Sequence, residues 1–311
     1  MPEAIKTENL TKRFAGLTAV EDINLAVPAG EIFGLVGPDG AGKTTLIRLL
    51  ATILLRSDGD AQVGGYSVTD QAQLVRPLVG YMSQRFTLYV DLTVLENLRF
   101  FADIYRIPAD VRAKRIEELL AFSQLTGFTE RPAGQLSGGM KQKLALACTL
   151  IHEPRILLLD EPTTGVDPVS RRDFWKILSR LHQDGATIFV ATPYMDEAER
   201  CQRVALMKDG KIVLCDSPAN IKALVPGEVV AIEVGDAHQG ARVLREHPLA
   251  MRVDMYGEVL HVYTDDAGVA LPGFRRRLEE AGIGIVSIHP VELSMENAYI
   301  HLAGRIGGQT S

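Results

Sequence analysis

Short apolar runs alternate with helical patterns through the first part of the chain. Three of the runs are continuous: 32–36, 156–159 and 187–191. Such runs are typical of strands that are buried on both faces of a parallel sheet. A glycine-rich turn and a predicted helix over 44–55 follow the first run. Between the other two runs, apolar side chains recur at helical spacing: Phe174, Ile177, Leu178 and Leu181. Strand, helix and strand in this order predict a βαβ unit.

The remaining segments predict a helical region and a second domain. Residues 91–150 have mainly helical patterns, and the composition changes near Val225-Pro226-Gly227, which favours a linker. Beyond the linker, the pattern predicts strands over 228–234, 251–256, 259–263 and 283–288, and helices over 240–246, 274–281 and 294–302. Taken in chain order, the elements from 228 to 288 follow the order βαββαβ. This order indicates a small α+β domain of split-βαβ type. We therefore expect domains over 1–225 and 226–311.

Composition narrows the classes of protein to which the chain can belong. Of its 311 residues, 46% are apolar, which is enough for one large or two ordinary domains. The 33 basic and 39 acidic side chains give a net charge of −6, so we expect no nucleic-acid partner. We expect neither a transmembrane segment, because no apolar run reaches about 18 residues, nor a signal peptide. The three cysteines contain no C-x-x-C pair, which argues against a disulfide scaffold or a zinc site and favours a protein of the reduced cytosol. We therefore expect any role at a membrane to come through a partner.

A phosphate-binding motif, G-x-x-x-x-G-K-[ST], follows the first apolar run: Gly37, Pro38, Asp39, Gly40, Ala41, Gly42, Lys43 and Thr44. Glycines let the backbone turn successive N–H groups onto phosphate oxygens, and the N-terminus of the next helix adds positive partial charge. In this motif the lysine reaches the β- and γ-phosphates, and the hydroxyl of Thr44 binds Mg²⁺. The alternative is a chance glycine-rich loop, against which the strand before it and the helix after it argue. The motif predicts nucleotide binding but no particular reaction.

Two adjacent carboxylates, Asp160 and Glu161, end the second apolar run and indicate the reaction. Ligands bind at the carboxyl ends of the strands in open α/β sheets. We expect Asp160 to hold Mg²⁺, and Glu161 to polarise an attacking water, which hydrolysis requires and simple binding does not. A solvated pair of carboxylates at the start of a loop is the alternative.

A second glycine motif contains Ser137, Gly138 and Gly139 and precedes a helical pattern. A serine followed by two glycines presents a hydroxyl and N–H groups at a helix N-terminus, which makes a second anion site. Two such sites in one chain are explained if the second site closes over the nucleotide of another molecule. An ordinary N-cap at a flexible turn is the alternative.

Together these motifs resemble the nucleotide-binding subunit of ATP-binding-cassette (ABC) transporters. Residues 37–45 resemble the family's Walker A loop, which adds Thr45 to the predicted site, and residues 156–161 resemble its Walker B strand. Residues 136–142 resemble its LSGGQ-type signature, with Met140 in place of the usual glutamine. The resemblance implies an α/β fold, in which a P-loop NTPase core of ABC-cassette type carries an antiparallel β subdomain and a helical subdomain.

Three further residues receive roles from this resemblance. Gln84 lies at the position of the family's Q-loop, which links the γ-phosphate and Mg²⁺ to the membrane subunit. Phe14 looks like the aromatic residue that stacks on adenine, although a core phenylalanine of an antiparallel sheet fits the spacing equally well. Residues 164–167 resemble the D-loop, so Asp167 is expected at a dimer interface. The expected catalytic residues are then Glu161, Lys43 and Gln84, with Mg²⁺ on Thr44, Gln84 and Asp160.

Within the family, the chain is most similar to drug-efflux ATPases of the daunorubicin-resistance and multidrug type, on the evidence of residues 80–97 and 293–302. This resemblance implies an ATP-hydrolysing subunit that drives export of a drug-like or hydrophobic substrate. It implies a head-to-tail homodimer, or a heterodimer with a second ABC ATPase subunit, that carries integral membrane permease subunits. Each ATP would lie between Lys43 of one chain and Ser137 of the other, and the chain would be peripheral on the cytoplasmic face of the membrane.

A second position departs from the family pattern: Pro193 replaces a histidine that usually follows the fourth buried strand. Proline has no N–H and no side-chain donor, so it cannot hydrogen-bond a γ-phosphate. We expect Thr192 to cap a helix in which Pro193 is the first residue. Three interpretations follow. The site hydrolyses ATP slowly, the chain pairs with a different and complete subunit, or another group replaces the missing imidazole. Two other functions stay open, namely a soluble ABC ATPase and a nucleotide sensor with little turnover.

Overall fold

The three continuous apolar runs form the buried strands β3 (Ile32–Val36), β7 (Ile156–Asp160) and β8 (Thr187–Thr192) in the computed structural model, which describes residues 2–85 and 88–307. They belong to a six-stranded sheet with the order β10-β9-β3-β8-β7-β6. The other strands are β6 (Val79–Met82), β9 (Arg203–Lys208) and β10 (Lys211–Asp216). All neighbours pair in parallel except β9 and β10. Consequently the glycine-rich loop after β3 and the carboxylates at the end of β7 lie at the same edge of the sheet.

A second sheet in the same part of the chain is antiparallel and has the order β2-β1-β4-β5. Its strands are β1 (Glu3–Phe14), β2 (Leu17–Pro28), β4 (Asp58–Val63) and β5 (Tyr66–Ser67). Helix α1 (Lys43–Leu50) contacts both sheets, and its apolar side chains share one core with them. The helix ends before the predicted residue 55 because Thr52 has a left-handed backbone, with φ 59°.

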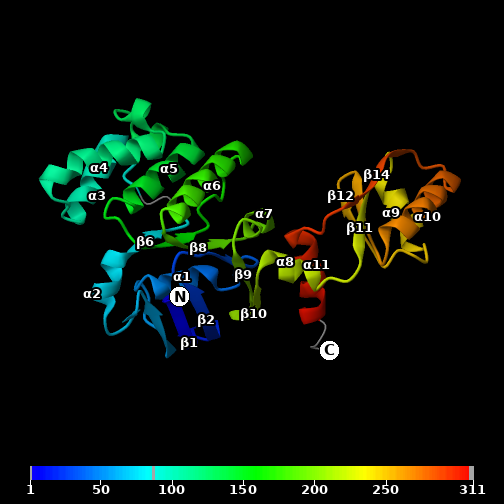
Figure 1. The fold of residues 1–311 in the computed structure, drawn as a ribbon, viewed down its shortest axis with the longest axis horizontal. Helices are drawn as coiled ribbons and strands as arrows, with labels where there is room; N and C mark the ends of the chain where they lie inside the picture. The colour runs from blue at the N-terminus through cyan, green and yellow to red at the C-terminus, as the bar shows by residue number, and fades with distance from the viewer. Residues whose placement is uncertain (1, 86–87, 308–311) are drawn as a thin grey trace. The chain divides into compact units, whose positions relative to one another are not determined.

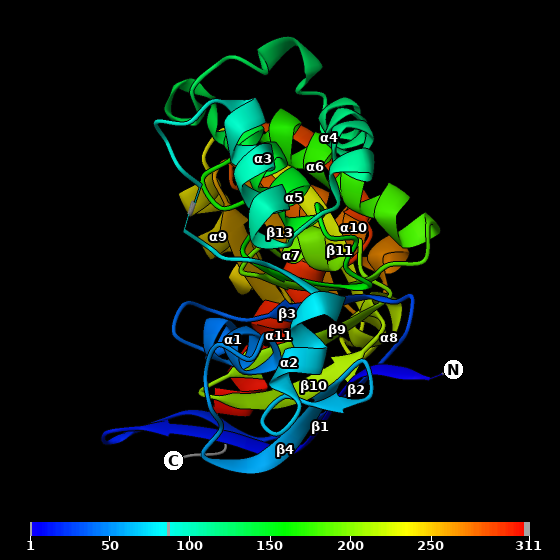
Figure 2. The ribbon, with the colours of Figure 1, turned by 90° about the vertical axis from the view of Figure 1, so that its left-hand side faces the viewer.

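The other face of the six-stranded sheet is covered by helices of the predicted helical region and by the helix between β7 and β8. Figure 1 shows α5 and α6 on the side of the sheet opposite α1, and Figure 2 shows the same layers after a quarter turn. The larger helices are α3 (Val94–Ile104), α4 (Ala109–Phe122), α5 (Gly138–Thr149) and α6 (Pro168–Gln183). The short elements are α2 (Ala72–Val75), α7 (Met195–Ala198) and the 3₁₀ turns η1 (Arg76–Leu78), η2 (Thr126–Phe128) and η3 (Ala133–Gln135).

The chain divides into two units, Met1–Ser217 and Pro218–Ser311, although Met1 and residues 308–311 lie outside the described part. The predicted boundary lies at 225/226. The intervening helix α8 (Pro218–Ala223) belongs with the second unit because it packs against the last helix, α11 (Met295–Gly307). None of the helices in the described part is long and apolar enough to cross a lipid bilayer.

The second unit contains an antiparallel sheet with the order β12-β13-β11-β14, covered on one face by α9 and α10. The elements follow the predicted order βαββαβ: β11 (Glu228–Val234), α9 (Ala237–Arg245), β12 (Arg252–Tyr256), β13 (Val259–Thr264), α10 (Ala267–Glu280) and β14 (Ile285–Val291). Both helices begin earlier than predicted. Asp236 and Asp266 cap them by accepting backbone hydrogen bonds, a signal that the apolar spacing did not contain.

Candidate functional site

The glycine-rich loop joins the end of β3 to the start of α1, so its backbone meets the N–H groups of a helix N-terminus. Two of its glycines have no room for a side chain. A Cβ on Gly37 would lie 2.2 Å from the carbonyl oxygen of Met207, and one on Gly42 would lie 2.3 Å from that of Ala19. Gly42 also has φ +107°, which L residues rarely adopt. Packing against two neighbouring strands therefore fixes the shape of the loop.

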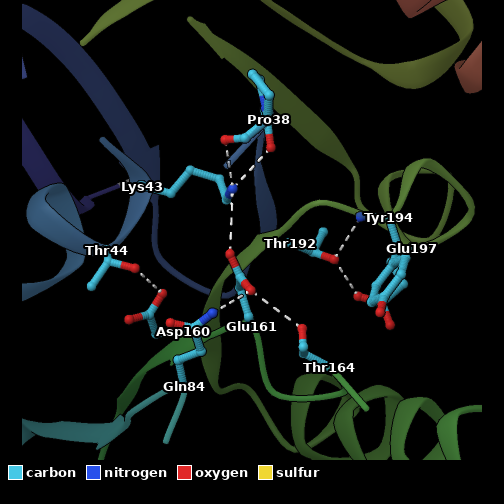
Figure 3. A network of polar contacts seen from close by, with 11 residues as sticks. Pro38, Lys43, Thr44, Gln84, Asp160, Glu161, Thr164, Thr192, Tyr194 and Glu197 are labelled. Atoms are coloured by element: carbon cyan, nitrogen blue, oxygen red, sulfur yellow. Dashed lines mark hydrogen bonds and ion pairs between the residues drawn. The ribbon is translucent and has the colours of Figure 1, made fainter. Parts of the chain in front are cut away.

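Lys43, the first residue of α1, turns its side chain back over this loop (Figure 3). Its Nζ donates hydrogen bonds to the carbonyl oxygens of Gly37 at 2.8 Å and Pro38 at 3.1 Å. The same Nζ lies 3.3 Å from Oε1 of Glu161, and both side chains are buried. Buried charges are stable only when they are paired and hydrogen-bonded, and this pair meets both conditions. The ammonium group is held where the motif places the far end of a phosphate chain.

Glu161 directly follows β7 and has an unusual backbone conformation for its residue type, with φ 50°. Its N–H donates to the carbonyl oxygen of Ala191 in the adjacent strand. Its Oε2 accepts hydrogen bonds from Nε2 of Gln84 at 2.8 Å and from Oγ1 of Thr164 at 3.3 Å (Figure 3). Strained backbone persists only where its surroundings fix it, and it is common at active sites. The carboxylate is thus positioned by three separate segments.

Asp160, the last residue of β7, faces Thr44 rather than Lys43 (Figure 3). Its Oδ1 accepts a hydrogen bond of 2.9 Å from Oγ1 of Thr44. Its Oδ2 is buried and has no hydrogen-bond partner among the described residues, and burial raises the pKa of this carboxyl. Carboxylate and hydroxyl oxygens are the ligands that Mg²⁺ prefers, and a cation would satisfy the unpartnered oxygen. These residues therefore fit the predicted Mg²⁺ ion, with the Gln84 amide close to the neighbouring Glu161.

A pocket of about 580 Å³ brings most of the predicted residues together. It is lined by Phe14 at the end of β1, by Leu17 at the start of β2 and by these predicted residues: Asp39, Gly40, Ala41, Gly42, Lys43, Thr44, Thr45, Gln84 and Glu161. Phe14 is 45% exposed, so it is not a core residue of the antiparallel sheet. Nζ of Lys12 lies 5.0 Å from the centre of its ring. An exposed aromatic ring beside a phosphate-binding loop suits a base that stacks on it.

The second glycine motif does not line this pocket. Ser137 is the N-cap of α5, and its Oγ accepts a hydrogen bond of 3.3 Å from the N–H of Met140. Asp167 caps α6 in the same way, through Val169 and Ser170, and hydrogen bonding with Ser170 holds the pKa of its carboxyl below the usual value. Both residues thus have structural roles as N-caps, and both remain at the surface of the unit, outside the pocket.

Pro193 follows β8, but the helix predicted to start there begins later. Helix α7 starts at Met195, and Thr192 does not cap it, so this prediction is wrong. Instead, Oγ1 of Thr192 accepts from the N–H of Tyr194 at 3.1 Å and donates to Oε2 of Glu197 at 2.7 Å. The hydroxyl is committed to the buried carboxylate of Glu197, which the sequence analysis missed. An acidic residue in a short helix at the carboxyl end of a buried strand was the available signal.

Comparison with known proteins places this geometry in a family. The sequence model described as ABC transporter matches residues 20–164. The Nod factor export ATP-binding protein I of Ralstonia nicotianae is 35% identical over 303 residues, covering 97% of this chain and 94% of that protein. The chain belongs to the ABC transporter family. The daunorubicin resistance ATP-binding protein DrrA3 of Streptomyces coeruleorubidus is 33% identical over 303 residues, covering 97% of this ABC chain and 96% of that one.

A longer relative and a solved structure are also similar to this ABC protein. A probable multidrug ABC transporter ATP-binding protein of Escherichia coli is 44% identical over 254 residues, which are 81% of this chain and 44% of that protein. The chain thus spans less than half the length of this relative. The dimeric structure of a post-hydrolysis ATP-binding cassette bound to ADP and Pi matches with a TM-score of 0.63 and 29% identity, over 68% of this chain and 98% of that one. The predicted family is confirmed, and relatives of the predicted drug-efflux type are among those that match.

Proposed function

We propose that the chain is the ATP-binding and ATP-hydrolysing subunit of an ABC exporter of drug-like or hydrophobic molecules, which acts with separate membrane permease subunits on the cytoplasmic face of the membrane. One observation carries the proposal: Glu161 directly contacts both Lys43 and Gln84 in a pocket that Phe14 also lines. The names of the relatives, which include multidrug, daunorubicin resistance and Nod factor export proteins, support the direction of transport and the class of substrate.

The pocket residues divide the work of hydrolysis among them. The N–H groups of the glycine-rich loop and Nζ of Lys43 bind the phosphates, and Phe14 stacks on adenine. Thr44, Asp160 and Gln84 would hold Mg²⁺, which would supply positive charge to offset that of the phosphates. Glu161 orients a water and accepts its proton while the water oxygen bonds to the γ-phosphorus and the bond to the β-phosphate oxygen breaks. ADP and inorganic phosphate are the products.

A second subunit completes the site in this proposal. Ser137, Gly138 and Gly139 present N–H groups at the start of α5 but lie outside the pocket of their own chain. They would bind the γ-phosphate of an ATP on the opposite chain, and Asp167 would lie at the same interface. The dimeric arrangement of the similar ADP-bound cassette supports this mode of association. The partner is a second copy or a related ATPase subunit.

A nucleotide-sensing role is the second candidate, because Pro193 cannot donate a hydrogen bond to phosphate. We favour hydrolysis, because the Glu161 carboxylate is hydrogen-bonded and in place next to Lys43. The proposal also includes two domains, of which only the N-terminal one supplies residues of the pocket.

The test is ATP hydrolysis and ATP-dependent association of the full chain, purified with its co-expressed membrane partner. Wild-type protein should release phosphate, and Glu161→Gln should lower this rate by more than about 100-fold while ATP-dependent dimerisation persists in light scattering. ATP-driven uptake of a fluorescent hydrophobic dye into inverted membrane vesicles tests transport. Absence of both hydrolysis and ATP-dependent association would refute the proposal, whereas association without hydrolysis in wild type would favour the sensor.

A further inference from the structure

Glu197 in α7 has a fully buried carboxylate, although the catalytic scheme above does not use it. Both oxygens accept hydrogen bonds from threonine hydroxyls, Oε1 from Thr163 and Oε2 from Thr192. Nε of Arg171 in α6 lies 3.8 Å from Oε1. Desolvation of a carboxylate costs several kcal/mol unless hydrogen bonds and an opposite charge compensate for it. Three separate segments supply that compensation here.

The contacts of Glu197 join the loop after β7 to the end of β8. Thr163 belongs to the first segment and Thr192, next to Pro193, to the second (Figure 3 shows Thr192 and Glu197). Arg171 is held over the ring of Tyr194, with its guanidinium carbon 4.0 Å from the ring centre. The start of α6 is thereby fixed to the segment that follows β8.

The loop that Glu197 holds is the one that carries the catalytic carboxylate. Thr163 is two residues from Glu161 and adjacent to Thr164, whose hydroxyl bonds Oε2 of Glu161 at 3.3 Å. The N–H of Thr164 also bonds the carbonyl oxygen of Glu161 at 3.2 Å, and that of Val166 bonds the carbonyl oxygen of Thr163 at 3.1 Å. Because these turns are tight, a shift of Thr163 moves Thr164 and the strained backbone of Glu161 with it.

We propose that Glu197 is a positioning residue for ATP hydrolysis, which fixes the Glu161 loop to the end of β8 through Thr163 and Thr192; this inference rests on the proposed function. Glu197 does not line the pocket that contains Lys43 and Glu161. A misplacement of about 1 Å at a catalytic group lowers the rate by up to about 100-fold, so the effect falls on turnover. ATP affinity depends on Lys43, Phe14 and the glycine-rich loop, which Glu197 does not contact.

The experiment compares variants that remove or keep single hydrogen bonds. Thr163→Val removes the hydroxyl without changing the shape of the side chain, and Thr163→Ser keeps the hydroxyl. Glu197→Gln removes the negative charge, and Asp196→Asn removes a neighbouring exposed carboxylate that pairs with Arg171 but contacts neither threonine. Phosphate release at saturating Mg-ATP gives kcat, fluorescent ATP binding gives Kd, and circular dichroism selects temperatures at which every variant is folded.

We expect Thr163→Val and Glu197→Gln to lower kcat by about tenfold or more with Kd unchanged within about twofold, while Thr163→Ser and Asp196→Asn stay near wild type. In a Glu161→Gln background, Thr163→Val should cause no further loss in single-turnover hydrolysis, because it acts through Glu161. Equal losses of kcat and affinity, or an additive loss in that background, would assign Glu197 a structural role only. An unaffected Thr163→Val variant overturns this inference alone, whereas an inactive wild type overturns the proposed function.

Discussion

Gly139 in the second glycine motif lies against α6, and this contact predicts a large difference between two adjacent glycines. A Cβ on Gly139 would lie 2.4 Å from Cβ of Ser170, whereas a Cβ on Gly138 would meet only the carbonyl oxygen of Gly165 at 3.5 Å. The first distance is about 1 Å shorter than normal carbon–carbon contact. Gly139→Ala must therefore push α5 and α6 apart, while Gly138→Ala needs no movement.

Overpacking of this kind costs about 1–3 kcal/mol, a large fraction of the roughly 5–15 kcal/mol that stabilises a domain. We expect Gly139→Ala to lower the free energy of unfolding by that amount and Gly138→Ala to change it by less than about 0.5 kcal/mol. Urea denaturation followed by tryptophan fluorescence measures this directly, because the one tryptophan, Trp175, is buried in α6.

A double-mutant cycle with Ser170→Gly separates this contact from other effects of the substitution. Ser170→Gly removes the Cβ that Gly139→Ala would meet, so the double variant should recover most of the stability that Gly139→Ala loses. Wild-type stability of Gly139→Ala, or equal destabilisation by Gly138→Ala, would refute the packing argument. The glycine would then be required for nucleotide binding alone.

Three further outcomes are expected. Phe14→Ala should weaken ATP binding by about 5- to 150-fold, the effect of losing about 1–3 kcal/mol of stacking, with Phe14→Tyr near wild type; equal affinity of both variants in a fluorescent ATP assay would exclude stacking. Pro193→His should raise kcat with Kd unchanged within about twofold, because it supplies a phosphate donor; an unchanged rate with altered affinity in phosphate-release and binding assays would contradict this. Cys148 and Cys201 are buried and Cys215 is exposed, although burial raises the pKa of all three thiols. Iodoacetamide at pH 8 should therefore alkylate Cys215 alone in the folded protein, as read by mass spectrometry, and rapid labelling of Cys148 would contradict its burial.

The elements that the sequence predicts best are those whose burial is complete on both faces. Strands β3 and β8 appear in the sequence as unbroken apolar runs, and their lengths agree with the structure to within a residue. The end of α1 could not be predicted in this way, because residues 53–55 are apolar although Thr52 has already left the helix. Apolar spacing describes which side chains prefer burial and does not report the backbone conformation of a single residue.

The candidate site divides in the same way between local and long-range features. Residues 37–44 form a local motif, so the loop and Lys43 could be named from the sequence alone. Glu161 could be named because it follows a buried strand directly. The hydrogen bonds of Glu197 come from residues 5 and 34 positions away in the chain, and no local pattern reports a contact of that kind. The departure at Pro193 was visible, but the hydrogen bonds of the segment around it were not.

Lys43 forms an ion pair with Glu161 and is also the residue expected to bind phosphate. The carboxylate and the phosphates of a nucleotide would therefore compete for the same ammonium group. We expect a nucleotide whose phosphates reach Nζ to draw the lysine away and to leave the Glu161 carboxylate free to accept a proton. A diphosphate also reaches the lysine, through its β-phosphate, but it offers Nζ one anionic group fewer than a triphosphate does. We therefore expect the number of phosphates on the bound nucleotide to set how far Lys43 is withdrawn from Glu161.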